Sequence, residues 1–154
     1  MATQASKWVL GHLASVVDTS DRYGMVYIRT PAHTPGPPPH YHEDATELFL
    51  ILRGRLDVIC DGCAVPLGPG ESFVVPRRSV HTFSNASDME TEWVTTYAPD
   101  GFQAFFTDFG VDASEADAQR RSVDGELVGR VVAMCARYGM ILADMPATRA
   151  DADR

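Results

Sequence analysis

Residues 37–47 read PPPHYHEDATE, and the apolar run Leu48 to Leu52 follows directly. Residues two apart on a β-strand point to the same face of the sheet, so the side chains of His40 and His42 are expected to aim together. Tyr41 lies between them with the opposite parity and is expected to face away. The stretch therefore predicts a pair of imidazoles that project from one face of a strand.

Two further residues extend this pair to a metal site. Glu47 opens the strand that follows, and His81 comes after a second turn-rich stretch, Gly70 to Pro76. Three imidazoles and one carboxylate suit zinc, iron, nickel, copper, manganese or cobalt. The sequence thus predicts one divalent transition-metal ion, of a kind that it does not specify, bound by His40, His42, Glu47 and His81. Such a ligand set leaves coordination positions open, as catalysis requires.

Short strands are expected around these residues. Runs rich in Val, Ile, Phe, Thr and Leu recur along the first two-thirds of the chain, and Gly, Pro, Asp or Asn stands in most gaps. The runs are Trp8 to Val17, Tyr23 to Arg29, Glu47 to Leu52, Leu56 to Cys60, Glu71 to Val75, Val80 to Ser84 and Glu92 to Tyr97. Asp61-Gly62 is a two-residue hairpin signal, and Cys60 and Cys63 on either side are interpreted as hairpin thiols. The pattern is typical of an all-β sandwich or barrel, with a core over about residues 7–98.

The last third of the chain changes period. Phe102 to Phe109 fits a short helix, and Val123 to Tyr138 fits a longer one that ends at Gly139, where a C-cap glycine belongs. Its expected apolar face comprises Leu127, Val128, Val131, Val132, Cys135 and Tyr138. We expect a C-terminal helical segment over about residues 101–139 that covers the outside of a sheet, with a pocket lid or a dimer element as the alternatives.

Length and composition indicate one domain over residues 1–154. The formal net charge of -8 and the lack of a Lys/Arg cluster argue against nucleic-acid binding. No apolar run approaches the roughly 20 residues of a membrane-spanning helix, so no membrane interaction is expected. Met1 to Leu10 lacks the features of a signal peptide, and the three cysteines are an odd number. We therefore expect reduced thiols in a cytoplasmic protein.

The spacing of the metal ligands resembles that of single-domain cupins of the cupin 2 type. The first cupin motif has a glycine, then, six residues on, His-x-His, a glutamate after three or four residues and a second glycine after six more. From the first histidine on, the residues at these offsets are His40, His42, Glu47 and Gly54. The second motif has Gly, five residues, Pro-x-Gly, then His and Asn, and the matching residues are Gly70, Pro76, His81 and Asn85. Two turn positions depart from the pattern: Thr34 stands where the first glycine is expected, with Gly36 nearer, and Arg78 replaces the glycine after Pro76. The resemblance implies a cupin jelly-roll β-barrel, and a homodimer, since cupins often pair.

A narrower resemblance extends over nearly the whole chain. The Gly-Pro-Pro-Pro-His segment, the stretch Tyr97 to Phe106 and the Ala136 to Gly139 helix end are similar to quercetin dioxygenase-like cupins. This implies a metal-dependent dioxygenase that acts on an aromatic or enolic small molecule. Two alternatives stay open: a metal-dependent cyclase, isomerase or lyase with a polyketide-type or small acid substrate, and a non-catalytic cupin that binds a metal or small ligand.

Candidate catalytic and substrate-binding residues follow from the same reading. Glu47 is the candidate catalytic residue, either as a plain ligand or as a base that also takes a proton, since burial raises a carboxyl pKa while a metal lowers it. Strand parity with a ligand or with one another selects Phe49, Ile51, Phe73, Val75 and Phe83 as side chains that face a pocket inside the barrel. Tyr27 is added as a further lining candidate, and Arg78 as a group at the pocket mouth for an anionic substrate.

Overall fold

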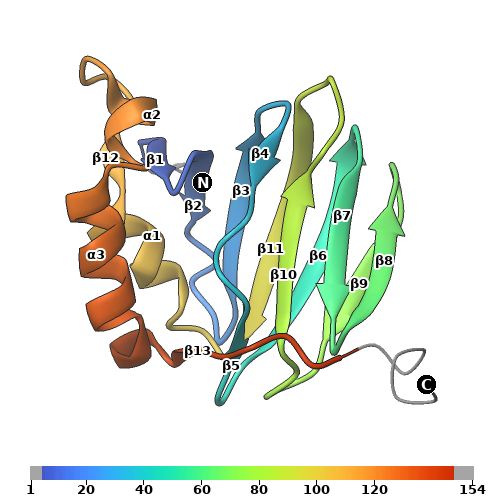
Figure 1. The fold of residues 1–154 in the computed structure, drawn as a ribbon. Helices are drawn as coiled ribbons and strands as arrows, with labels where there is room; N and C mark the ends of the chain where they lie inside the picture. Colours follow the sequence, from blue (N-terminus) through green and yellow to red (C-terminus); the bar gives the residue numbers. More distant parts are fainter. Residues whose placement is uncertain (1–4, 148–154) are drawn as a thin grey trace.

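Two antiparallel sheets make up most of the molecule in the computed structural model, which describes residues 5–147 (Figure 1). The first sheet has the strand order β12 (Val111–Asp112), β1 (Lys7–Val9), β2 (His12–Val17), β3 (Gly24–Thr30), β11 (Thr91–Ala98), β6 (Thr46–Arg53) and β9 (Ser72–Val75). The second has the order β13 (Met140–Leu142), β5 (His40–His42), β10 (His81–Asn85), β7 (Leu56–Cys60) and β8 (Cys63–Leu67), and β4 (Thr34–Pro35) pairs with β10. The two ends of the predicted domain, residues 1–4 and 148–154, lie outside the described residues.

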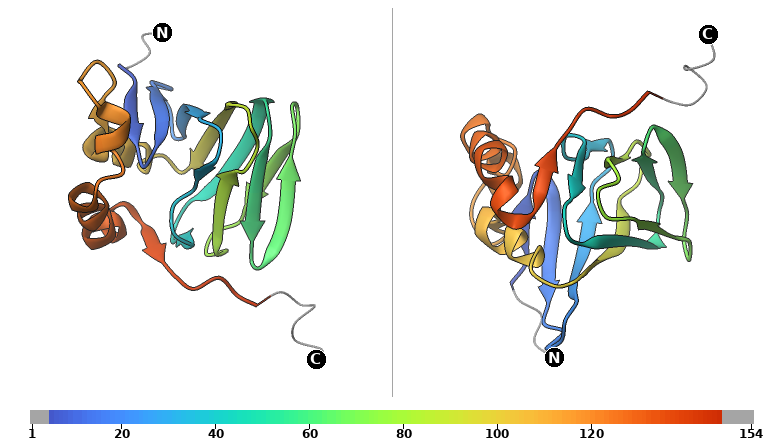
Figure 2. Two further views of the ribbon diagram at one scale, coloured as in Figure 1. Left: turned by 45° about the horizontal axis from the view of Figure 1, so that its top comes forward. Right: turned by 90° about the horizontal axis from the view of Figure 1, so that it is seen from below.

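The sheets face each other and enclose the core between them (Figure 2). Side chains alternate along each strand, because successive residues point to opposite faces. In β6, Glu47, Phe49 and Ile51 are buried, whereas their neighbours are half-buried or exposed. Leu56 and Val58 of β7 fill the core from the other sheet. The all-β sandwich predicted from the sequence is confirmed.

Two turns test the predicted strand boundaries: one was predicted, and the other divides a predicted strand in two. The hairpin predicted at Asp61-Gly62 joins β7 to β8, with positive φ at both positions, 47° and 77°. The run predicted from Trp8 to Val17 is two strands, because Leu10 and Gly11, with φ of 49° and 86°, reverse the chain between β1 and β2.

The two departures from the cupin motifs have structural accounts. Gly36 lies against the backbone of β10, and a Cβ atom there would clash with the carbonyl group of Phe83. Arg78 takes a φ of 65°, the left-handed conformation that glycine adopts without steric cost. The chain therefore keeps the turn after Pro76 although the glycine is replaced.

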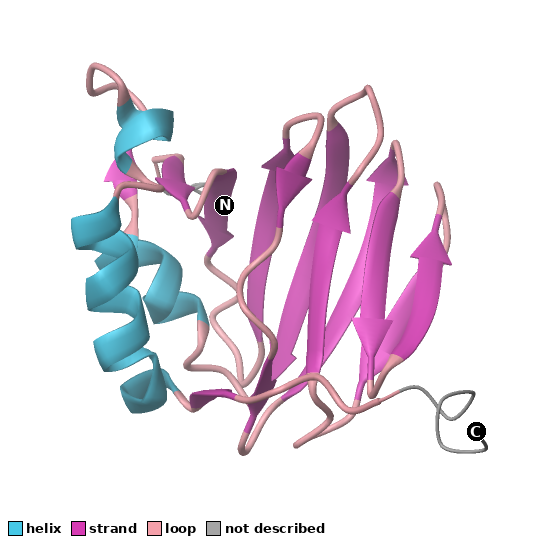
Figure 3. Ribbon diagram, in the orientation of Figure 1, coloured by secondary structure: helices cyan, strands magenta, loops and turns pink. Residues whose placement is uncertain are grey.

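Helices occupy one edge of the sandwich, beside β1 and β2 (Figure 3). They are α1 (Gln103–Phe109), α2 (Ala118–Arg121) and α3 (Gly125–Met134), and a 3-10 turn, Cys135–Tyr138, follows α3. The Asp124 carboxylate caps α3 by accepting a hydrogen bond from the Leu127 amide at 2.9 Å. Of the described helices, none is long and apolar enough to cross a membrane.

The longer helix buries a narrower face than the sequence predicts. Val131 and Cys135 are buried, one turn apart, but Val132 is 50% exposed. The prediction for Val132 is wrong because α3 covers an edge, so that only one stripe of the helix meets the layer beneath. That layer is α1: the guanidinium of Arg130 in α3 lies 5.9 Å from the centroid of the Phe109 ring, and the Tyr138 ring of the following 3-10 turn lies 5.5 Å from the same ring. Gly139, with φ of 74°, ends the segment as expected.

After this turn the chain returns to the second sheet as β13, which the sequence did not predict. β13 pairs with β5 in the register Met140 to His42 and Leu142 to His40. The strand that carries two of the predicted metal ligands therefore lies between β10 and β13.

Candidate metal centre and its cavity

The four predicted metal ligands meet at one end of the sandwich. His40 and His42 project from β5, Glu47 from β6 in the other sheet, and His81 from the start of β10. Each is at most 3% exposed. Their candidate ligand atoms all lie within 4.8 Å of one another, a group that could hold a metal ion.

Backbone carbonyls orient two of the imidazoles. The Nδ1 atom of His40 lies 2.9 Å from the Pro38 oxygen, and that of His81 lies 3.0 Å from the Ser79 oxygen. Because a carbonyl oxygen only accepts, each Nδ1 carries the proton that it donates. The other nitrogen, Nε2, is then free to act as a ligand, the arrangement usual at metal-binding histidines.

Both oxygens of Glu47 are fixed in place. Oε2 lies 2.9 Å from Nε2 of His81 and 3.1 Å from Nε2 of His42. Oε1 accepts hydrogen bonds from the hydroxyls of Thr95 and Tyr97, each at 2.8 Å. Thr95 and Tyr97 lie on β11, where Tyr97 is the direct partner of Glu47 across the sheet. The carboxylate therefore presents Oε2 to the histidines.

The electrostatics of the cluster suit a cation. Burial alone would raise the pKa of the Glu47 carboxyl, but hydrogen bonds from His42 and His81 hold it well below its usual range. Burial would lower the pKa of His81, but the bond to Glu47 and its charge raise it. Burial and the charges of the other two histidines lower the pKa of His40 to about 3. A carboxylate that draws a proton onto one imidazole also attracts a divalent cation, which would replace that proton.

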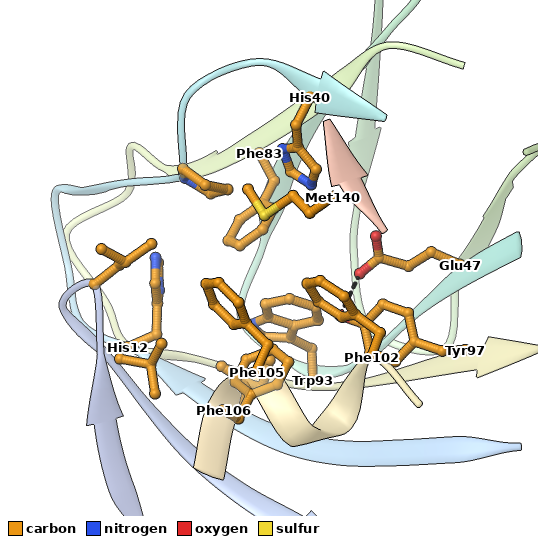
Figure 4. A pocket seen from close by; sticks show the side chains of 14 residues that line it. His12, His40, Glu47, Phe83, Trp93, Tyr97, Phe102, Phe105, Phe106 and Met140 are labelled. Atoms are coloured by element: carbon orange, nitrogen blue, oxygen red, sulfur yellow. Dashed lines mark hydrogen bonds between the residues drawn. The ribbon is translucent and has the colours of Figure 1, made fainter. Parts of the chain in front are cut away.

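A small apolar cavity of about 40 Å³ lies beside this cluster (Figure 4). His40 and Glu47 border it on the metal side, and His12 lies at the opposite side. Its remaining lining is almost wholly apolar and aromatic: Val9, Leu10, Ile28, Pro37, Phe83, Trp93, Tyr97, Phe102, Phe105, Phe106 and Met140. One wall, Phe102, also lines a surface groove of about 300 Å³ that includes His42 and Tyr138.

Of the seven side chains predicted to bind substrate, the structure places Phe83 in this lining. Phe49, Ile51 and Val75 are buried in the core and Phe73 packs against it, all outside the cavity lining. Tyr27 points the other way and donates a hydrogen bond to Glu92 at 2.7 Å. Arg78 is exposed and lines neither the cavity nor the groove; its backbone amide donates to the His42 carbonyl. Alternation along a strand predicts the face to which a side chain points but not whether the side chain reaches the cavity. Tyr27 lies on the outward face of β3.

Sequence reasoning missed most of the lining. Phe102, Phe105 and Phe106 come from the start of α1, and Met140 comes from β13. The family resemblance includes the stretch Tyr97 to Phe106 but assigns no role to its rings. Nothing in the local pattern marked His12.

The matched family accounts for the ligand spacing. Residues 26–97 match the model of the cupin domain. All four candidate ligands lie within it, whereas His12, α1 and β13 lie outside.

Two curated relatives match parts of this chain. Quercetin 2,3-dioxygenase from Bacillus subtilis is 37% identical over 71 residues, 46% of this chain and 21% of that protein. Polyketide synthase CurC from Streptomyces cyaneus is 33% identical over 60 residues, 39% of each chain. The matched stretches thus span less than half of either relative.

A solved structure shows the same fold. KdgF from Halomonas sp. superposes with a TM-score of 0.57 at 20% identity, over 65% of this chain and 87% of that one. The cupin architecture predicted from the motifs is confirmed. The homodimer and the cytoplasmic location stay predictions.

Proposed function

We propose that this cupin binds one divalent transition-metal ion through His40, His42, Glu47 and His81 and catalyses a dioxygenation of a small aromatic or enolic molecule. The observation that carries the proposal is the position of the cluster: His40 and Glu47 are at once candidate ligands and walls of an aromatic cavity. A substrate in that cavity would therefore meet the metal directly. The partial match to quercetin 2,3-dioxygenase supports the oxygen-dependent reading.

The bound ion would supply Lewis acidity and hold a substrate oxygen. The chain supplies the rest. Phe83, Trp93 and Phe102 line an apolar site that excludes water and favours a flat ring. Thr95 and Tyr97 hold Oε1 of Glu47, so Oε2 is the atom placed to accept the proton of a substrate hydroxyl. In this proposal Glu47 acts both as ligand and as base.

The size of the cavity adds a requirement. About 40 Å³ is room for a few water molecules, since roughly 10–15 Å³ by this measure holds one. A ring needs more room, and Phe102 separates the cavity from the 300 Å³ groove. Rotation of the Phe102 side chain would join the two spaces and admit a ring from the surface to the cluster.

Oxygen consumption tests the proposal. The protein is loaded separately with Fe²⁺, Mn²⁺, Co²⁺, Ni²⁺, Cu²⁺ and Zn²⁺, and each form is assayed with an oxygen electrode against flavonols, catechols and cyclic enols. We expect uptake with at least one pair, and a loss of about 100-fold or more in Glu47→Gln, because an amide neither takes the proton nor carries the charge. Glu92→Gln is the matched control, since Glu92 bonds Tyr27 outside the cavity. A fully metallated protein that consumes no oxygen with any of these substrates contradicts the dioxygenase.

A second candidate is a metal-dependent cyclase, isomerase or lyase that needs no oxygen. The partial match to polyketide synthase CurC favours it, because the aligned 60 residues are 39% of each chain, so the two chains are of about equal length. Turnover under nitrogen by the zinc-loaded protein would support this candidate. Ligand binding without turnover, in air or under nitrogen, would instead support a binding module.

A further inference from the structure

His12 is a buried polar group that the metal centre does not use. It is the first residue of β2, is 4% exposed, and lies on the opposite side of the cavity from Glu47, with aromatic side chains in between (Figure 4). Its ring packs against Phe83 at 5.3 Å. The other walls near it, Val9 and Leu10, are apolar.

A short chain of hydrogen bonds fixes the tautomer of His12. The indole Nε1–H of Trp93 donates to Oγ1 of Thr30 at 2.9 Å, and the same Oγ1 lies 3.0 Å from Nδ1 of His12. Thr30 is fully buried, and its hydroxyl proton has no acceptor among the described residues other than Nδ1. The hydroxyl therefore donates to Nδ1, because the alternative leaves a buried proton unpaired. Nε2 of His12 must then carry the ring proton.

This Nε2–H has no hydrogen-bond partner within residues 5–147. Among the buried side-chain nitrogen and oxygen atoms of these residues, Nε2 of His12 is the one without a partner. Burial lowers the pKa of His12 to about 4, and the backbone carbonyl of Pro35, which approaches the ring without the distance and angle of a normal hydrogen bond, raises it in part, so the imidazole is neutral near pH 7. Leaving a buried donor unpaired is unfavourable, because the group loses its hydrogen bonds to water and gains none in return. A donor kept neutral, oriented and unpaired on the wall of a cavity is suited to a ligand.

We propose that His12 is a substrate-binding residue whose Nε2–H donates a hydrogen bond to an acceptor oxygen, a carbonyl or ether, at the end of the substrate remote from Glu47. The identity of the molecule as a substrate rests on the proposed function; the hydrogen bond does not. The preferred ligand then has two polar ends, an ionisable hydroxyl towards the metal cluster and a neutral acceptor towards His12, joined by a flat apolar body.

The first experiment reads the tautomer in the wild-type protein, with no substitution. Long-range ¹H–¹⁵N spectra of histidine-labelled protein, with and without Zn²⁺, should show His12 as a neutral ring protonated at Nε2 from pH 6 to pH 8. Adding acetophenone should shift the Nε2 resonance, whereas α-methylstyrene, which has CH₂ in place of the carbonyl oxygen, should not. A ring protonated at Nδ1, or equal responses to both compounds, overturns the proposal.

The second experiment measures binding of the same two compounds. Wild-type protein should prefer acetophenone by about three- to tenfold, the effect of one neutral hydrogen bond. His12→Phe should abolish this preference, and His12→Gln, which can present an amide N–H near the position of Nε2, should restore part of it. Ile28→Val is the control, because it trims an apolar wall of the same cavity and should leave the preference intact.

These readouts separate the two proposals. Neither compound needs the metal or oxygen, so the preference for acetophenone can hold even if no dioxygenation is found. If neither compound binds, or if His12→Phe keeps the preference, the role of His12 is wrong whatever the oxygen assay shows.

Discussion

The two ends of the cavity differ in how their polar groups are paired. At the metal end, Glu47 alone contacts four side chains, and carbonyls of the chain orient two of the imidazoles. At the other end a single imidazole is oriented on one side and unpaired on the other. The first arrangement suits a permanent ion and the second suits a ligand that comes and goes. Four substitutions and measurements test whether the two ends are as separate as this contrast implies.

The largest effect is expected from His81→Ala. Zn²⁺ affinity should fall by more than about 100-fold, beyond the 10- to 100-fold typical of residues that only support ligands, because a ligand itself is lost. His12→Phe should change that affinity by less than about threefold. Isothermal titration calorimetry measures both. A similar loss in His12→Phe would show that the two ends act as one site.

Acid should destabilise the folded protein through His12, at the end of the cavity opposite Glu47. Since the pKa of His12 is lowered to about 4 in the folded protein, the unfolded chain binds a proton first as the pH falls below about 6.5. His12 should therefore reduce the free energy of unfolding progressively between about pH 6.5 and pH 4, by roughly 2 kcal/mol at pH 5. Urea unfolding of metal-free protein at several pH values measures this. The slope should be shallower in His12→Phe; equal slopes would mean that His12 binds protons equally in the folded and unfolded states.

A smaller effect is expected from Thr95→Val. The substitution keeps the side-chain shape but removes one of two donors to Oε1 of Glu47, and Zn²⁺ affinity should fall about tenfold. Thr96→Val is the matched control, because Thr96 is the next residue of β11 and points to the opposite face. If both variants bind Zn²⁺ as the wild type does, the Thr95 bond does not support the ligand.

No effect at all is expected at His12 when metal is added. Among the five histidines, those at positions 40, 42 and 81 should change their ¹⁵N resonances on titration with Zn²⁺, whereas His12 and the exposed His33 should not. Nitrogen spectra at each point of the titration measure this. A change at His12 would indicate that the ion, rather than a substrate, reaches the far side of the cavity.

The same two ends of the cavity differ in how well the sequence predicts them. The metal cluster was predictable because His40, His42 and Glu47 lie on two strands that follow one another in the sequence, where parity and spacing place side chains almost directly. Most strands were predictable too, since turns such as Asp61-Gly62 carry their own signals. Val132 was misplaced because periodicity gives the direction of a helix face but not the width of the surface that it meets.

The end of the cavity at His12 could not be predicted from strand alternation and turn signals. His12 reaches the cavity only because β2 pairs with β3; its partner Thr30 lies on β3, and Trp93, which donates to Thr30, lies on β11. Phe105 and Met140 arrive from a helix and a strand beyond the cupin domain. Parity therefore selected Phe49 and Ile51, which face inward correctly but lie in the core, away from the opening.

The pairing of β13 with β5 has a consequence for how the protein is made. A ribosome releases β5, with His40 and His42, well before it releases residues 140–142. Until then the nascent chain can complete only the β10 side of that strand, and Met140, a wall of the cavity, is absent. The order of synthesis thus delays closure of the cavity until the helices have been translated. An ion that binds before then binds to a site that is still open to solvent.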